Sequence, residues 1–259
     1  MWEALSEIVR YRELLQELVG RDMRVRYKQT LLGAAWALFL PVAMMVVFTQ
    51  IFAARHEESD GSIPYPLFAY CGLLPWQFFA ASLKGSVESL TRNRLLVTKI
   101  YMPREVFPLA QVLACGVDFA IASLVLVGLM AWYDVVPSAT VVLVPFVLLL
   151  QVTLSFGLAL LVSMGHLFYR DVKYVFDVLV LLWMFATPVV YDVPTAGRWS
   201  WLFMLNPMTP IIESYRALIL RSELPDPYRL GFAAAVSLTA FWIGVRSFHA
   251  SEHLFAEKI

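Results

Sequence analysis

Ionisable side chains that interrupt the apolar stretches of this sequence include Lys84, Glu88, Asp118 and Asp177. An ionisable group inside a membrane costs free energy, so it marks a binding or transport site by default. For Asp118 the alternative is a hydrogen bond or ion pair between two helices, and Asp177 could reach water near the end of its stretch. Lys84 and Glu88 stand four residues apart, so on a helix they share a face and can pair or reach the interface. The set is not the chain of acids that a proton-coupled pump needs.

The sequence carries no motif for catalysis by this chain alone. It has no GxxxxGK[ST] loop to hold the phosphates of ATP, and no GxSxG turn for a nucleophilic serine. His249 and His253 stand one helical turn apart, but the glutamate position of an HExxH zinc site is not acidic here. Cys71 and Cys115 lie in apolar stretches without metal-ligand spacing. We therefore expect no catalytic residue, cofactor or metal ion on this chain.

The composition is that of a membrane protein. Hydrophobic residues make up 60% of the chain and charged residues 15%, against about 45–50% and 25% in soluble domains. One core of this size could not hide so much apolar surface, so lipid must solvate much of it. The formal net charge is zero, which leaves no basic face for nucleic acid. The first apolar stretch begins only after Leu32, so the N-terminal run is not a cleavable secretory signal.

Six segments predict membrane-spanning helices, which need about 20 mainly apolar residues. They are Ala34–Ala54, Pro66–Ser89, Glu105–Ala131, Val141–Gly165, Tyr174–Tyr191 and Leu230–Phe248. Basic residues concentrate before the first segment and in the links after the second and the fourth, whereas the alternate links are poor in them. Because basic loops stay in the cytoplasm, both termini are predicted to be cytoplasmic.

The fold class is therefore an all-α integral membrane protein with a single domain over residues 1–259. Its predicted parts are an interface region (1–32), five spans (34–191), an outer region (192–229), a sixth span (230–248) and a cytoplasmic tail (249–259).

The interface region has the pattern of an amphipathic helix. Leu5, Ile8, Leu15 and Val19 fall on one side at 3.6 residues per turn, opposite a row of charged residues. Gly20 is placed to end this helix. We expect it to lie along the cytoplasmic membrane surface, and packing against a soluble partner protein is a second interpretation that can hold at the same time.

The outer region contains two short apolar stretches broken by prolines. Trp199–Leu205 is too short to span a membrane, and Ile211–Leu220 follows after Asn206-Pro207 and Pro210. This pattern favours a re-entrant helical hairpin, which is tolerated where protein or a water-filled cavity surrounds it. Two helices lying flat at the interface are the alternative.

Aromatic residues form 14% of the chain and gather near the predicted outer side. An interfacial belt of Trp and Tyr accounts for part of them. Those inside or at the end of spans need another explanation, because aromatic faces can stack on sugar rings at many weak points and leave a polymer free to slide. The candidate lining residues are Trp76, Phe79, Trp183, Phe185 and Tyr191.

Four stretches, in order, resemble the ABC-2 type polysaccharide export permeases, which include O-antigen and teichoic acid exporters. They are GRDMRVRYKQTLLGAAWALFLPV (Gly20–Val42), NRLLVTKIYMPREVFPL (Asn93–Leu109), FYRDVKYVFDVLVLLWMFATPVVY (Phe168–Tyr191) and LNPMTPIIESYRALIL (Leu205–Leu220). Together they cover most of the chain. The resemblance implies a homodimer in the bacterial inner membrane, two copies of a cytoplasmic ATPase that binds ATP and Mg, and an undecaprenyl-pyrophosphate-linked glycan as substrate.

The resemblance also implies roles for three groups of residues. Docking of the ATPase on a coupling helix falls to Asn93, Leu95, Leu96, Lys99, Pro103, Arg104 and Glu105. A site where the lipid pyrophosphate enters falls to Arg24, Arg26 and Tyr27. An outer gate, in which an ion pair could hold the segment shut or touch sugar hydroxyls, falls to Asn206, Pro207, Glu213 and Arg216.

Two other functions are the alternatives to polysaccharide export, and the sequence fits each of them less well. An ABC-2 exporter of a small drug or lipid would not need aromatic residues within the spans. A membrane glycosyltransferase or acyltransferase would need acidic or histidine residues grouped at one membrane face, and the scattered Asp and His residues do not supply such a group. The motifs do not distinguish O-antigen from capsule-like polysaccharide or teichoic acid.

Overall fold

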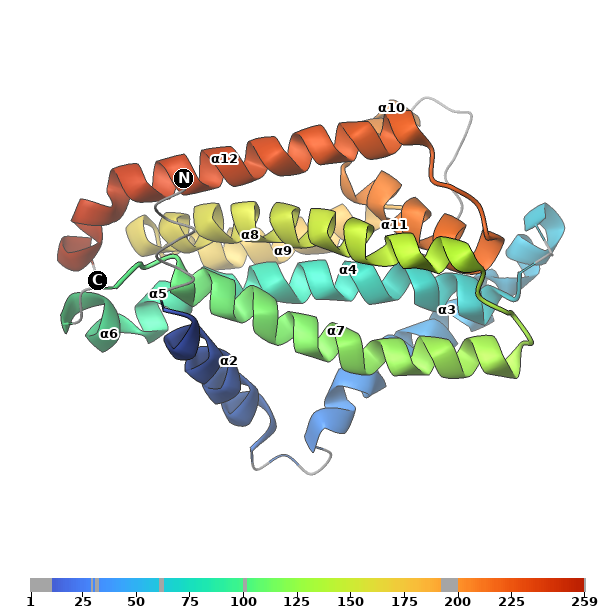
Figure 1. The fold of residues 1–259 in the computed structure, drawn as a ribbon, viewed down its shortest axis with the longest axis horizontal. Helices are drawn as coiled ribbons and strands as arrows, with labels where there is room; N and C mark the ends of the chain where they lie inside the picture. The colour runs from blue at the N-terminus through green and yellow to red at the C-terminus, as the bar shows by residue number, and fades with distance from the viewer. Residues whose placement is uncertain are drawn as a thin grey trace.

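The protein is a bundle of α-helices with both long and short members (Figure 1). A computed structural model describes residues 11–28, 30, 33–60, 63–99, 102–191 and 200–258, and these ranges contain no β-strand. The predicted all-α fold is confirmed. The helices are α2 (Arg12–Tyr27), η1 (Gly33–Ala35), α3 (Trp36–Asp60), α4 (Tyr65–Val87), α5 (Ser89–Arg92), α6 (Arg94–Lys99), α7 (Val106–Trp132), η2 (Ala139–Leu143), α8 (Val144–Phe168), α9 (Val172–Phe185), α10 (Ser200–Leu205), α11 (Met208–Arg216), η3 (Ala217–Arg221) and α12 (Pro227–Lys258).

Four of the described helical segments are long and apolar enough to cross a membrane. They are Trp36–Ala54, Val106–Trp132, Ala139–Phe168 and Pro227–Phe255, so the chain is an integral membrane protein. The second predicted span forms α4, which has 23 residues but is not among these four segments. The fifth forms α9, which has only 14 residues and is therefore about 21 Å long at 1.5 Å per residue.

Helix α4 owes its tolerance of polar residues to its central place in the bundle (Figure 1). It packs against α3, α7, α8, α9 and α11, and most of its side chains are buried by these neighbours. Gln151 of α8 donates to the carbonyl oxygen of Pro75 at 2.6 Å, so a polar side chain of a neighbouring helix bonds directly to the main chain of α4. The hydroxyl side chains of Ser82 and Ser86 on α4 are thus buried by protein, whereas Lys84 is exposed.

Helices α8 and α12 approach each other backbone to backbone. A Cβ atom at Gly244 would stand 2.4 Å from the carbonyl oxygen of Gly157, and one at Gly157 would stand 2.5 Å from the amide nitrogen of Phe241. Small residues permit such close crossings in membrane bundles, where packing replaces the hydrophobic effect as the force between helices. The two glycines therefore fix where α12 crosses α8.

The N-terminal helix differs from its prediction. Helix α2 runs through Gly20 to Tyr27, so the prediction that Gly20 ends the helix is wrong. A glycine inside a helix costs only about 1 kcal/mol, and the packing of α2 against α7 offsets that cost. Leu5 and Ile8 of the predicted apolar side lie outside the described residues.

One end of the bundle, here called the α6 end, has a small core of its own. It joins α2, the short helices α5 and α6, the start of α7 and the last turns of α8 and α12 (Figure 1). Its buried members include Leu18, Leu90, Val97, Phe107, Phe248 and Phe255. The predicted tail 249–259 is therefore helical as far as Lys258, and it contributes to this core.

We predict that Gly244→Val lowers the free energy of unfolding by about 1–3 kcal/mol or more, because the valine side chain would clash with the backbone of Gly157 on α8. The purified protein in detergent should unfold at a lower temperature. Gly128→Ala is the matched control, since a Cβ there meets nothing within 4 Å. Equal melting temperatures for the two variants would contradict the close crossing.

Candidate functional site

A charged cluster joins the end of α2 to the middle of α7. The guanidinium group of Arg26 pairs with the carboxylate of Asp118, and the Tyr27 hydroxyl donates to the other oxygen of that carboxylate at 2.5 Å. Burial, and then the hydrogen bond to Asp118, raise the pKa of Tyr27 above its ordinary value, so the phenol remains a neutral donor. Of the two interpretations of Asp118, the structure shows the bond between helices.

This cluster forms one wall of a cavity of about 440 Å³ between α2, α3, α4 and α7. The opposite walls are apolar and include Trp36, Leu40, Leu74 and Phe78. A charged end and an apolar body suit an amphiphilic ligand better than a fully polar one. Arg24, which was grouped with Arg26 by resemblance, does not line this cavity. Its exposed side chain reaches Glu17 at 3.6 Å instead.

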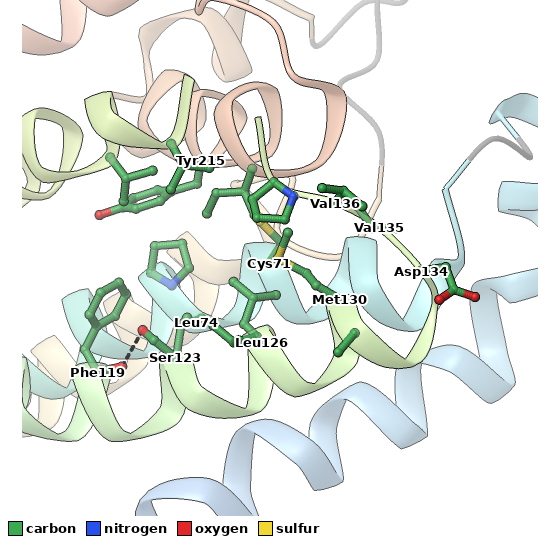
Figure 2. Close-up of a pocket in the computed structure, with 17 residues that line it drawn as sticks. Cys71, Leu74, Phe119, Ser123, Leu126, Met130, Asp134, Val135, Val136 and Tyr215 are labelled. Carbon is green, nitrogen blue, oxygen red and sulfur yellow. Dashed lines mark hydrogen bonds between the residues drawn. The ribbon is translucent and has the colours of Figure 1, made fainter. Parts of the chain in front are cut away.

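A second cavity, of about 540 Å³, is lined in large part by residues of α4 and α7 (Figure 2). Leu74 and Phe119 line both cavities, so they stand between the two. The second cavity is almost wholly apolar and continues past Leu126 and Met130 to Asp134 (Figure 2). Neither composition nor periodicity predicted it, because it depends on how helices distant in the sequence are packed.

The predicted coupling residues fall into an outward set and an inward set. Leu95 on α6 is 69% exposed, whereas Leu96 is partly buried against the α6-end core. Asn93 is buried and donates to the carbonyl oxygen of Ser89 at 2.7 Å. Pro103 is half-buried, and the side chain of Lys99 lies outside the described residues. One side of the short helices α5 and α6 therefore packs on the α6-end core, and the other side, with Leu95, is exposed.

Two of the coupling residues contact the far end of the chain. Arg104 donates to the main-chain oxygen of Glu252, and its guanidinium group is 3.7 Å from the carboxylate of the same residue. Glu105, which is buried, lies 3.1 Å from Nε2 of His249. Both partners belong to the last turns of α12.

The candidate lining aromatics are not equivalent. Trp76 and Phe79 are buried within the chain, and Phe79 meets the half-buried Trp183 edge to face, with ring centroids 5.1 Å apart. Phe185 is 63% exposed at the end of α9. Tyr191 is half-buried and donates to the carbonyl oxygen of Phe185 at 2.6 Å. Phe185 is thus the exposed member of the set, Trp183 and Tyr191 are half-buried, and Trp76 and Phe79 are buried.

Asn206 joins the segment after α9 to the start of α11. Its amide nitrogen donates to the carbonyl oxygen of Ala186 at 3.0 Å and to the Thr187 hydroxyl at 2.8 Å. Its amide oxygen accepts from the indole N–H of Trp183 and from the backbone N–H of Met208, each at 3.0 Å. Pro207 beside it is buried. The side chain thus satisfies four polar groups where the chain turns between α10 and α11.

Arg216 is the largest fully buried side chain in the described part of the protein. It donates to the carbonyl oxygens of Pro188 at 3.0 Å and Val189 at 2.6 Å, and its guanidinium carbon lies 3.7 Å from the ring centroid of Phe68. Gly72 of α4 makes room for this arrangement, since a Cβ there would stand 2.2 Å from the oxygen of Val189. One side chain therefore ties α11 to α4 and to the turn after α9.

The predicted pair of Glu213 and Arg216 is present, with 2.7 Å between carboxylate and guanidinium. Glu213 also receives Arg221 at 3.4 Å. Its carboxylate therefore sits between two arginines, one fully buried and one partly exposed.

Comparison with known proteins places the chain in a family. The family described as ABC-2 type transporter matches residues 13–220. The chain belongs to the ABC-2 transporter membrane family. Its relatives include the O-antigen export system permease protein RfbA of Myxococcus xanthus, which is 32% identical with all of both chains covered. The protein of the same name in Klebsiella pneumoniae is 30% identical, with 95% of this chain and 94% of the relative covered. The polysialic acid transport protein KpsM of Escherichia coli is 22% identical over 92% of this chain and 93% of its own.

Family membership confirms the resemblance drawn from the sequence motifs. The relatives are permease and transport proteins rather than enzymes. Among the described residues of this ABC-2 subunit, no three His, Cys, Asp or Glu side chains come together as metal ligands.

Lys84 and Glu88, predicted to pair or reach the interface, each find partners on α9 or nearby in this ABC-2 subunit. Lys84 lies 3.6 Å from Asp177. The Glu88 carboxylate accepts hydrogen bonds from Nζ of Lys173 at 2.6 Å and from Nη2 of Arg92 at 2.8 Å. Only the bond from Glu88 to Arg92 has a sequence signal, the four-residue helical spacing. The other two bonds needed the packing of α9 beside α4.

We predict that Arg216→Ala destabilises the protein by about 2–5 kcal/mol, because truncation leaves a cavity, two buried carbonyl oxygens lose their donor, and the partly buried carboxylate of Glu213 keeps only Arg221. Thermal unfolding of the purified subunit measures the change. Arg229→Ala removes a surface pair with Asp226 and should alter stability by less than about 1 kcal/mol. If both variants unfold at the wild-type temperature, Arg216 does not hold these elements together.

Proposed function

We propose that this chain is the membrane-spanning permease subunit of an ATP-driven exporter of undecaprenyl-pyrophosphate-linked polysaccharide, most directly O-antigen. The observation that carries the proposal is the 32% identity, from one end of the chain to the other, with an O-antigen export system permease protein. A second relative named for polysialic acid transport supports a polysaccharide as the substrate class. The subunit moves the substrate, and a separate protein hydrolyses ATP.

The proposed topology has six spans in the bacterial inner membrane and both termini in the cytoplasm. Four spans meet the length and hydropathy of free-standing helices. The other two are α4, most of whose side chains are buried by its neighbours, and α9 with the turn that follows it. The distribution of basic residues between alternate links supports the cytoplasmic termini. Helices α10 and α11, joined at Asn206 and Pro207, form the outer re-entrant hairpin of this topology, and α11 packs against α4, α8 and α12.

The proposed assembly is a homodimer with two copies of a cytoplasmic ATPase that binds ATP and Mg. The open side of α6, with Leu95 outward, is the proposed docking point of the ATPase. Broad apolar surfaces on α3 and α9 support a second copy as the neighbour that lines the conduit. Exposed residues of these two helices include Trp36, Phe39, Leu40, Val47, Ile51, Val178, Leu182 and Phe185.

The cavity beside Arg26 is the proposed site where the lipid carrier enters. Arginine suits phosphate because its fork of N–H donors can bind two oxygens at once. Here Asp118 takes one of these donors, Nη1, so a pyrophosphate group must compete with the carboxylate for that nitrogen. Trp36, Leu40 and Phe78 supply apolar walls for the adjoining part of a lipid.

We predict that Arg26→Gln lowers export of the lipid-linked glycan about tenfold or more. A hydrogen bond to a charged group contributes roughly 1.5–3 kcal/mol, and about 1.4 kcal/mol corresponds to a tenfold change in binding. Export into inverted membrane vesicles, normalised to the amount of assembled transporter, measures the effect.

Arg24→Gln is the matched control for this experiment. Arg24 lies on the same helix, carries the same charge and faces solvent and Glu17 rather than the cavity. Export should stay close to wild type in this variant. An equal fall in both variants would mean that general charge on α2, rather than the cavity, is what matters.

The outer gate and the aromatic conduit remain parts of the proposal. The exposed ring of Phe185, and Tyr191 bonded to its carbonyl oxygen, are the conduit aromatics best placed in this structure. The gate role rests on Glu213 and Asn206, whose bonds hold α11 and the turn after α9 in one arrangement. Because Arg216 is fully buried, a gating movement would carry α11 together with that turn.

The second candidate function is export of a small drug or lipid. The apolar cavity of Figure 2, with its volume of about 540 Å³, favours it, since pockets of about 300–1,000 Å³ hold drug-sized ligands.

Deletion of the gene distinguishes the two functions. We expect surface glycan, detected with an antibody or lectin that does not cross membranes, to disappear while lipid-linked glycan accumulates inside the cell. Unchanged surface glycan in a strain without a second exporter would reject polysaccharide export and favour the small-molecule function.

A further inference from the structure

The link between α6 and α7 contacts the last turns of α12 through hydrogen bonds and ion pairs. Arg104 and Glu105 are consecutive residues just before α7, and their partners Glu252 and His249 stand three apart on α12. That spacing places both partners on the same side of a helix. The link therefore meets one face of the last turns of α12, and the contact involves main chain as well as side chains.

Aromatic packing lies beneath these polar contacts. Phe248 and Phe255 are fully buried, and their rings meet edge to face with centroids 4.9 Å apart. The ring centroid of Phe168, at the end of α8, lies 6.3 Å from that of Phe255. The guanidinium carbon of Arg104 lies 5.8 Å from the Phe255 centroid. Edge-to-face rings and a cation over a ring each contribute beyond simple burial. The last turns of α12 are thus part of the α6-end core and not a loose tail.

Helix α12 is continuous from this contact to the other end of the bundle (Figure 1). It has 32 residues and is therefore about 48 Å long. At its middle it is locked to α8 at Gly157 and Gly244, and towards its start it packs against α11. A displacement of its last turns therefore cannot be absorbed by a break in the helix within the described residues.

We propose that Arg104, with Glu252, Phe255 and the pair of Glu105 and His249, forms a brace through which movement of α6 passes into α12. These are positioning residues, since none of them need touch the ATPase or the transported molecule. The proposal rests on the proposed function, in which an ATPase docks on α6. The docking surface on α6 accounts for binding of the ATPase, and the end of α12 has the additional role of transmitting the movement.

The test is amide hydrogen exchange of the complete transporter, permease with its ATPase, in lipid nanodiscs. Exchange is compared between the nucleotide-free complex and the complex trapped with ADP and vanadate. In wild type we expect nucleotide to change exchange in both residues 94–99 and residues 249–258. In Arg104→Met the change in 94–99 should remain, and the change in 249–258 should fall at least several-fold.

Three further variants keep this test specific. Arg104→Lys retains a cationic donor and should restore much of the wild-type response. Arg246→Met removes an exposed charge of α12 that touches only the Trp242 ring, at 5.5 Å among the described contacts, and should respond as wild type. If Arg104→Met fails to assemble, His249→Ala replaces it, because the His249 side chain is 43% exposed and its loss leaves the core intact.

The brace is rejected if residues 249–258 respond to nucleotide as strongly in Arg104→Met, or in its replacement His249→Ala, as in wild type. It is also rejected if wild type shows no response there. This readout requires no glycan, so a failure of polysaccharide export would leave it interpretable. Conversely, a rejected brace would not affect the export measured for the wild-type transporter.

Discussion

The cost of a bare charge in an apolar bundle organises this protein. Arg216 is fully enclosed, and its position is possible because two carbonyl oxygens, a carboxylate and an aromatic ring surround it. Asp118 in the middle of α7 is satisfied by two donors from α2. Each such group must find its partners on another element, so each one also fixes how two elements lie. The charges that looked like isolated functional residues in the sequence are thus the connections between helices.

The sequence was informative where local pattern determines structure. Long apolar stretches predicted the helices, the Asn206-Pro207 break predicted two short helices on either side of it, and the spacing of Glu213 and Arg216 predicted their ion pair. Local pattern failed where tertiary packing decides. Gly20 does not end α2, and α9 is shorter than the apolar run from Tyr174 to Tyr191.

The candidate site shows the same division. The motif around Arg26 and Tyr27 was visible, but their partner Asp118 lies about 90 residues away, and no periodicity links positions so far apart. Arg24 and Arg26 were indistinguishable in the sequence, and the direction of each side chain separates them. Trp76 and Phe79 were expected to line a conduit, and their burial within the subunit depends on helices that the sequence could not place. Their role as a lining stays a prediction, as do the roles of the gate residues.

Leu74 and Phe119 line both cavities. Their side chains therefore form part of the boundary between the charged cavity beside Arg26 and the apolar cavity. The Phe119 ring packs against two other rings, with centroid distances of 5.5 Å to Phe78 and 6.3 Å to Tyr215. Side chains move between a few discrete rotamers without displacing the backbone that carries them. A rotamer change of Phe119 would therefore alter the boundary between the two cavities without a displacement of the helices that form them.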